Sequence, residues 1–242
     1  MSTFVLVHGA MHGGWCWRAV ADGLADAGHT VRTPTLTGQG ERAHLASPSV
    51  GVATHVTDLV AVMEYDDLHD VHLVLHSYAG ILAGPVVDRS GGAVTRVSFL
   101  GAFLADPGEC LLDVEPPETA ARYRSLAAEQ GDGWRIPASP AFLDQWGVTD
   151  PTQRAVVAPR LTDFMLRCTT DPVDYPSDTL DRIPCAYVQH TAPPLPSLGA
   201  SVDRARARGW PVVDVACGHD LMLAAPDRTV EVLTRLDRGA PG

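Results

Sequence analysis

The chain has 242 residues, of which 45% are hydrophobic and 19% charged, as is typical of one globular domain with a sizeable core. Its 29 acidic and 18 basic residues give a net charge of −11, which argues against nucleic acid or an anionic membrane as partner and favours a small-molecule substrate. Every basic residue is an arginine. Schiff-base catalysis and a P-loop lysine are therefore excluded.

The cysteines favour a reducing compartment. There are five of them, widely spaced and with no C-x-x-C pair, which is typical of free thiols in a cytoplasm. We see no signal peptide and no membrane span, so we expect a cytoplasmic protein, and the absence of lysine favours a bacterial source. These cysteines are Cys16, Cys110, Cys168, Cys185 and Cys217.

The first predicted strand, Thr3 to Val7, ends in a glycine-rich loop from His8 to Gly14. The dinucleotide pattern G-x-G-x-x-G is not present there, so a nucleotide site is not favoured. The other use of such a loop is to turn backbone N–H groups toward a ligand.

Strands and helices then alternate. Residues Trp15 to Ala27 form a predicted helix, Thr30 to Pro34 the next strand, and His55 to Tyr65 a second helix that leads into a strand beginning at Val71. This order predicts an α/β fold with a mostly parallel, doubly wound sheet.

The stretch Val71 to Ile81 reads as a strand, a tight turn carrying Ser77, and a small-residue helix. A serine held on such a turn presents its hydroxyl above the sheet, which makes Ser77 the candidate nucleophile. The usual pattern is G-x-S-x-G, but this chain has Leu75 and Ala79 where the glycines stand. The alternative is that Ser77 merely ends a buried strand.

Another strand is predicted from Val94 to Leu104, after which the regular alternation is lost. Residues from about Cys110 to Asp181 are rich in proline and in short helix-like pieces that carry aromatic side chains. An insertion of this kind commonly covers a site and supplies its apolar walls, although packing alone also explains individual aromatics.

The alternation resumes with the strand Cys185 to Gln189, a helix from Leu198 to Arg208, the strand Pro211 to Val215 and a final helix from Pro226 to Leu236. His219 follows the last strand, at the edge of the sheet where we expect Ser77. A histidine is the usual base for a serine nucleophile, so His219 is the candidate base. The alternative is a solvated or structurally satisfied histidine.

Other histidines lie near the same edge, among them His8, His12 and His76. They show neither H-E-x-x-H nor H-x-H-x-D spacing, so we expect no metal and no cofactor. We interpret His8 and His12 as residues that pack and orient the glycine-rich loop.

Four motifs together resemble the α/β-hydrolase superfamily, and within it the branch of plant methylesterases, hydroxynitrile lyases and bacterial esterases. They are His8 to Trp17, Leu36 to Arg42, the Ser77 turn and Gly218 to Met222. The resemblance implies one domain over residues 1–242 with a helical cap at about 106–181, and a homodimer is common for this fold. It implies Ser77 as nucleophile, His219 as base, and the N–H groups of Ala10 and Tyr78 as oxyanion hole.

The acid of the triad is missing from both usual positions. The loop after Gln189 begins with His190 and has no acid, and Gly101 stands where bacterial relatives carry Asp. Asp106 remains as the candidate acid, with Glu109 beside it, while Asp220 is expected to point elsewhere. A hydroxynitrile lyase is disfavoured, because Ala10 and Asp220 replace the threonine and lysine of those enzymes.

Two kinds of enzyme remain. One hydrolyses a small carboxylic ester, lactone or thioester through a Ser77–His219 pair. The other is a non-hydrolytic tailoring enzyme of bacterial secondary metabolism, in which His219 moves protons for a cyclisation, elimination or C–C cleavage. A third alternative is a catalytically inactive ligand-binding protein.

Overall fold

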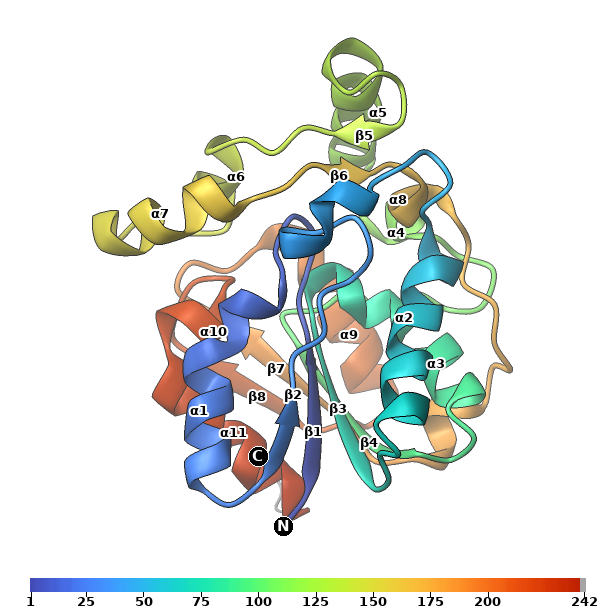
Figure 1. Cartoon of the computed structure of the whole chain (residues 1–242), viewed down its shortest axis with the longest axis vertical. Helices are drawn as coiled ribbons and strands as arrows, with labels where there is room; N and C mark the ends of the chain where they lie inside the picture. The colour runs from blue at the N-terminus through green and yellow to red at the C-terminus, as the bar shows by residue number, and fades with distance from the viewer. Residues whose placement is uncertain (240–242) are drawn as a thin grey trace.

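Six parallel strands form the central sheet of the computed structural model, which describes residues 1–239 (Figure 1). Their order in the sheet is β2-β1-β3-β4-β7-β8: the chain starts beside the edge strand β2, adds β2 on one side of β1, and then adds β3, β4, β7 and β8 on the other. The predicted α/β class with a doubly wound parallel sheet is confirmed. The strands are β1 Thr3–Val7, β2 Thr30–Arg32, β3 Val71–His76, β4 Val94–Leu100, β7 Cys185–His190 and β8 Val212–Val215.

Alternation along the strands divides the core into two layers. In β1, Val5 and Val7 face one core while Phe4 and Leu6 face the other, because successive side chains point to opposite faces of a sheet. Helices cover both faces (Figure 1). The first core takes residues from α2 Val52–Tyr65, α3 Ala83–Arg89 and α9 Gly199–Ala207, and the second from α1 Arg18–Asp26, α10 Leu221–Ala224 and α11 Pro226–Asp237.

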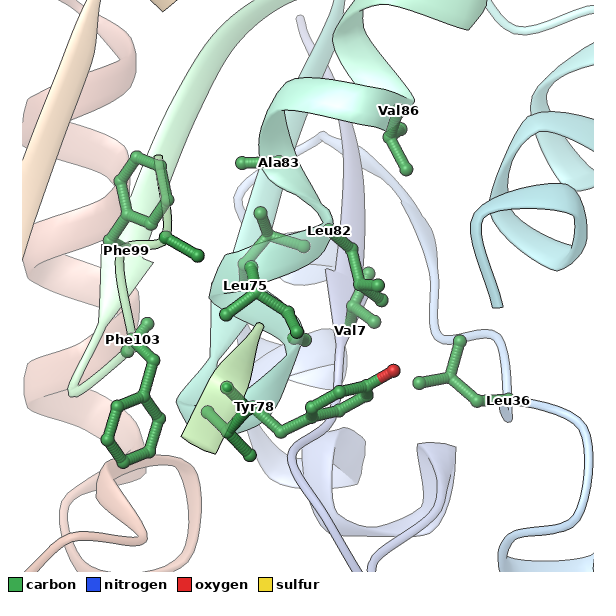
Figure 2. Close-up of a cluster of buried hydrophobic side chains, with 14 of the residues drawn as sticks. Val7, Leu36, Leu75, Tyr78, Leu82, Ala83, Val86, Phe99 and Phe103 are labelled. Atoms are coloured by element: carbon green, nitrogen blue, oxygen red, sulfur yellow. The ribbon is translucent and has the colours of Figure 1, made fainter. Parts of the chain in front are cut away.

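The turn after β3 is a 3-10 helix, η3 Ser77–Leu82, which leads into α3. Leu75, at a usual glycine position, is fully buried in the apolar cluster of Figure 2. The close approaches fall elsewhere: a Cβ on Gly80 would lie 2.3 Å from the Phe103 carbonyl oxygen, and one on Gly9 would lie 2.7 Å from the Ser77 Cβ. The turn therefore forms without glycine at positions 75 and 79.

Short helices from residues 111 to 170 lie above the carboxyl edge of the sheet (Figure 1). Proline stands at the first residue of α5 and of α7, a position where its missing N–H costs no helical hydrogen bond. The elements of this segment are α4 Leu111–Val114, α5 Pro117–Gln130, β5 Arg135–Ile136, α6 Ala141–Gln145, α7 Pro151–Val157, η4 Ala158–Arg160, β6 Phe164–Met165 and α8 Arg167–Thr170.

Short 3-10 helices complete the described chain: η1 Gly14–Trp17, η2 Gly40–Leu45, η5 Thr179–Arg182 and η6 Pro196–Leu198. Because all strands of the main sheet are parallel, the loops after β1, β3, β4, β7 and β8 meet at one edge. Within residues 1–239, no helix combines the length and the apolar character that crossing a membrane requires.

Candidate active site

Ser77 and His219 meet at the carboxyl edge of the sheet. Ser77 has a φ of +54°, a left-handed conformation that serines adopt rarely and that is typical of a strained nucleophile turn. Its Oγ lies 3.0 Å from His219 Nε2, which is hydrogen-bond distance. The structure thus brings together the two residues that the sequence singled out as nucleophile and base.

His219 is a neutral base. The ring is 2% exposed, and burial, reinforced by the imidazoles of His76 and His190, holds its pKa well below the ordinary value of 6.5. Nε2 is therefore free to accept the Ser77 proton. Nδ1 has no hydrogen-bond partner among residues 1–239, so no carboxylate of this part of the chain stabilises the imidazolium at that atom.

Asp106, the acid suggested by the sequence, does not reach the base. Its carboxylate lies 2.6 Å from Arg208 and 3.5 Å from Arg204, and it is half exposed. Glu109 also pairs with Arg204. The assignment of Asp106 as triad acid is corrected accordingly: it belongs to an ion-pair group between the loop after β4 and helix α9.

Gly101 lies directly beside the Nδ1 atom of the base. A Cβ at this position would be 3.3 Å from His219 Nδ1 and 2.9 Å from His190 Nδ1, and the φ of Gly101 is +49°. The His190 ring packs edge-on against the His219 ring at a centroid distance of 4.9 Å. His190 thus fills the place next to the base. The sequence did not single out this residue, although its position at the end of β7 was the available signal.

The nearest carboxylate in the sequence, Asp220, faces other histidines. It is 1% exposed and lies 3.4 Å from His12 Nε2 and 3.9 Å from His76 Nε2. Burial alone would lower the pKa of His12, but the negative charge of the nearby Asp220 carboxylate outweighs burial and raises it. His12 Nδ1–H donates to the Ala10 carbonyl at 2.9 Å, so this pair joins the base loop to the glycine-rich loop.

Further bonds hold the glycine-rich loop in one conformation. His8 Nε2 accepts the Leu36 N–H at 3.0 Å, while its Nδ1–H donates to the Gly9 carbonyl. The side-chain oxygen of Gln39 accepts the N–H of Met11, a residue with a φ of +66°. The interpretation of His8 and His12 as orienting residues agrees with these contacts.

His76, His219 and Asp220 are the described residues that come near enough to share a metal ion, since one ligand atom of each lies within 4.8 Å of the others. Two of their ring nitrogens already have partners within the protein. His76 Nε2–H donates to the His219 carbonyl at 3.0 Å, and His219 Nε2 lies against Ser77. The donor set fits a hydrogen-bonded core better than a metal centre.

A pocket opens above Ser77. Its cavity volume is about 40 Å³, so the pocket is narrow. Ala10 and Tyr78 line it beside Ser77 and His219, and the segment above the sheet supplies its walls. These walls are largely apolar but include Glu115, and their side chains are Leu111, Glu115, Tyr123, Ile136, Phe142, Gln145, Trp146, Phe164 and Thr169.

Comparison with known proteins gives consistent results. The sequence matches the alpha/beta hydrolase family over residues 4–232. A carbendazim hydrolyzing esterase from Nocardioides sp. (strain SG-4G) is 33% identical over 98% of this chain and 100% of its own length. Methylesterase 9 of Arabidopsis thaliana is 33% identical over 44% of this chain and 42% of its own. An extracellular α/β-hydrolase from a Paenibacillus species has the same fold, with a TM-score of 0.85, 22% identity, and coverage of 98% and 99% of the two chains.

A parallel sheet with a serine on the turn after β3 and a histidine after β8 defines a hydrolase-type enzyme. The chain belongs to the alpha/beta hydrolase family. Within that family it lies in the methylesterase-like branch.

Proposed function

We propose that this enzyme hydrolyses a small carboxylic ester, lactone or thioester through an acyl-Ser77 intermediate. The observation that carries the proposal is the 3.0 Å contact between Ser77 Oγ and His219 Nε2 at the floor of an apolar pocket. Similarity to an esterase along the whole chain supports the same reaction class.

In the first half-reaction the Ser77 Oγ attacks the ester carbonyl carbon while its proton passes to His219 Nε2. The N–H groups of Ala10 and Tyr78 would stabilise the negative oxygen of the tetrahedral intermediate, a role for which both residues lie beside Ser77 in the pocket. The C–O bond then breaks, and the leaving alcohol takes the proton from His219.

In the second half-reaction His219 removes a proton from water, and the resulting hydroxide attacks the acyl carbon. Collapse of this intermediate releases the carboxylic acid and returns the proton to Ser77 Oγ. No cofactor takes part in this scheme. We propose that residues 106 to 181 act as the cap that selects the substrate, and that the enzyme works on a small molecule in a bacterial cytoplasm.

Hydrolysis of aryl methyl esters by wild type, Ser77→Ala and His219→Ala tests the proposal. Each substitution should lower kcat by about a thousandfold or more, because nucleophile and base act as one unit. Circular dichroism would verify that both variants fold. Hydrolysis that survives either substitution in folded protein contradicts the proposal.

The unpartnered Nδ1 of His219, seen among the described residues, favours a second candidate, a non-hydrolytic tailoring reaction of secondary metabolism. There His219 would transfer protons in a cyclisation, elimination or C–C cleavage, and Ser77 would only hydrogen-bond the substrate. The two candidates differ in one variant: Ser77→Ala abolishes hydrolysis but leaves proton transfer by His219 largely in place.

A further inference from the structure

Glu115 is a buried carboxylic acid in the wall of the pocket above Ser77. It follows α4 directly, it is 8% exposed, and its Oε2 has no hydrogen-bond partner among residues 1–239. Burial of a carboxyl oxygen without a partner destabilises a protein, so this oxygen is unusual in a wall that is otherwise largely apolar.

The surroundings of Glu115 leave its charge without a counterion. No arginine or histidine pairs with it among the described residues. Tyr123 on α5 and Ser197 on η6 are the polar groups beside it, and their hydroxyls favour the charged form. Burial has the larger effect and raises the pKa of Glu115 to about 7. In either protonation state the carboxyl keeps an oxygen that accepts a hydrogen bond.

Among the titratable groups that line the pocket, Glu115 is the one suited to accept a hydrogen bond from a ligand N–H. Burial raises the pKa of Tyr78 and of Tyr123 well above the ordinary value, and His219 is a neutral base. Among the described lining residues there is no arginine, and Glu115 is the one carboxylic acid. A ligand with an N–H group or a protonated nitrogen would supply the missing partner, whereas an anionic ligand would be repelled.

We propose that Glu115 forms a polar subsite in the pocket that binds an N–H or cationic nitrogen of the substrate. The preferred substrates are then small esters whose apolar body carries such a nitrogen. The inference rests on the proposed ester hydrolysis and names the substrate class of that site. Glu115 is a specificity residue here, because the bond-breaking steps proceed at Ser77 and His219.

Matched substrates test the proposal. The methyl esters of the indole carboxylic acids carry an N–H, and the methyl esters of the corresponding benzofuran acids carry an oxygen in its place. For at least one ring position, wild type should prefer the indole by about tenfold or more in kcat/KM, mainly through KM. Glu115→Leu should bring the ratio near one, whereas Glu115→Gln should keep part of it, because an amide oxygen still accepts.

Gln145→Leu is the matched control. Gln145 lines the same pocket but its side-chain oxygen already accepts from Arg122, so this variant should keep the preference for the indole. A wild-type ratio near one at every ring position overturns the proposal. An indole-to-benzofuran ratio in kcat/KM that is the same in wild type and Glu115→Leu also overturns it.

A binding measurement separates this proposal from the proposed function. Calorimetry of indole and benzofuran with Ser77→Ala needs no turnover. If Ser77→Ala binds indole more tightly than benzofuran, and adding Glu115→Leu removes this difference, the subsite is supported. This holds even if no ester is hydrolysed, in which case only the proposed function fails. Equal binding of the two heterocycles overturns the subsite even if both esters are hydrolysed.

Discussion

At the residue scale, the strength of His219 as a base depends on the side chain that lies next to its Nδ1 atom. An imidazole ring takes the place where a triad acid would assist the base: His190 packs against His219, and Gly101 leaves the room for it. The neighbouring carboxylate, Asp220, is instead paired with His12. The base must therefore form its imidazolium without a directly bonded acid, which predicts slower turnover than an intact triad gives.

Gly101→Ala tests the packing around the base. The new Cβ would come within 2.9 Å of His190 Nδ1 and would hold a φ of +49°, so we expect kcat to fall about tenfold and stability to fall by about 1 kcal/mol. Gly28→Ala is the control, because Gly28 has a φ of +87° and no described neighbour within 4 Å. It should lose similar stability without loss of kcat. Equal kcat in wild type and Gly101→Ala would contradict the account.

Asp220→Asn tests the pairing with His12. Without the carboxylate charge, burial dominates at His12 and its pKa should drop below 6.5. NMR titration of the His12 ring measures this directly. We also expect lower kcat, because the His12 contact to the Ala10 carbonyl positions the glycine-rich loop. An unchanged His12 titration would show that Asp220 is not its partner.

At the element scale, the turn between β3 and α3 decides whether Ser77 is presented at all. Its tight contacts involve Gly80 and Gly9 rather than the positions of the usual pattern, and Leu75 contributes to the core (Figure 2). A side chain at position 75 is accommodated because it points into the first core, between the sheet and the helices that cover it.

Gly80→Ala should destabilise the protein by about 2 kcal/mol, because the new Cβ would meet the Phe103 carbonyl oxygen, a backbone atom that cannot move aside cheaply. Urea unfolding followed by circular dichroism gives the change. Gly199→Ala, at the start of α9 with open space around it, serves for comparison and should be neutral or stabilising. Equal stability of the two variants would refute the close approach at Gly80.

The elements themselves were largely predictable, and so was the meeting of Ser77 with His219. Strand periodicity and the order of strands and helices determine which loops share the carboxyl edge. The side chain packed against the base and the acid in the pocket wall were not predictable. His190 and Glu115 become neighbours of the site only through packing between segments far apart in the chain, and local patterns carry no signal for that.

At the scale of the whole molecule, several buried histidines stay uncharged. Burial lowers the pKa of His8 to about 3, and of His55, His76 and His190 to about 4. In the unfolded chain these rings take up protons below about pH 6.5. Between the pKa values in the fold and in the unfolded chain, the unfolded state binds more protons than the native state. The free energy of unfolding therefore decreases as the pH falls through this range.

The free energy of unfolding should therefore decrease by about 2 kcal/mol or more from pH 7 to pH 5.5. Urea titrations at the two pH values measure the decrease. His190→Gln should weaken the pH dependence, because it removes one of the rings that take up a proton in the unfolded chain but stay neutral in the fold. A stability that is flat over this range would contradict the neutral burial of these rings.

The central claim is that His219 activates Ser77 for acyl transfer, and covalent labelling tests it most directly. Wild type, Ser77→Ala and His219→Ala would each be incubated with a fluorophosphonate and measured by intact mass. We predict a single adduct on wild type that both substitutions abolish. An unlabelled but folded wild type, or labelling that persists in Ser77→Ala, would contradict it.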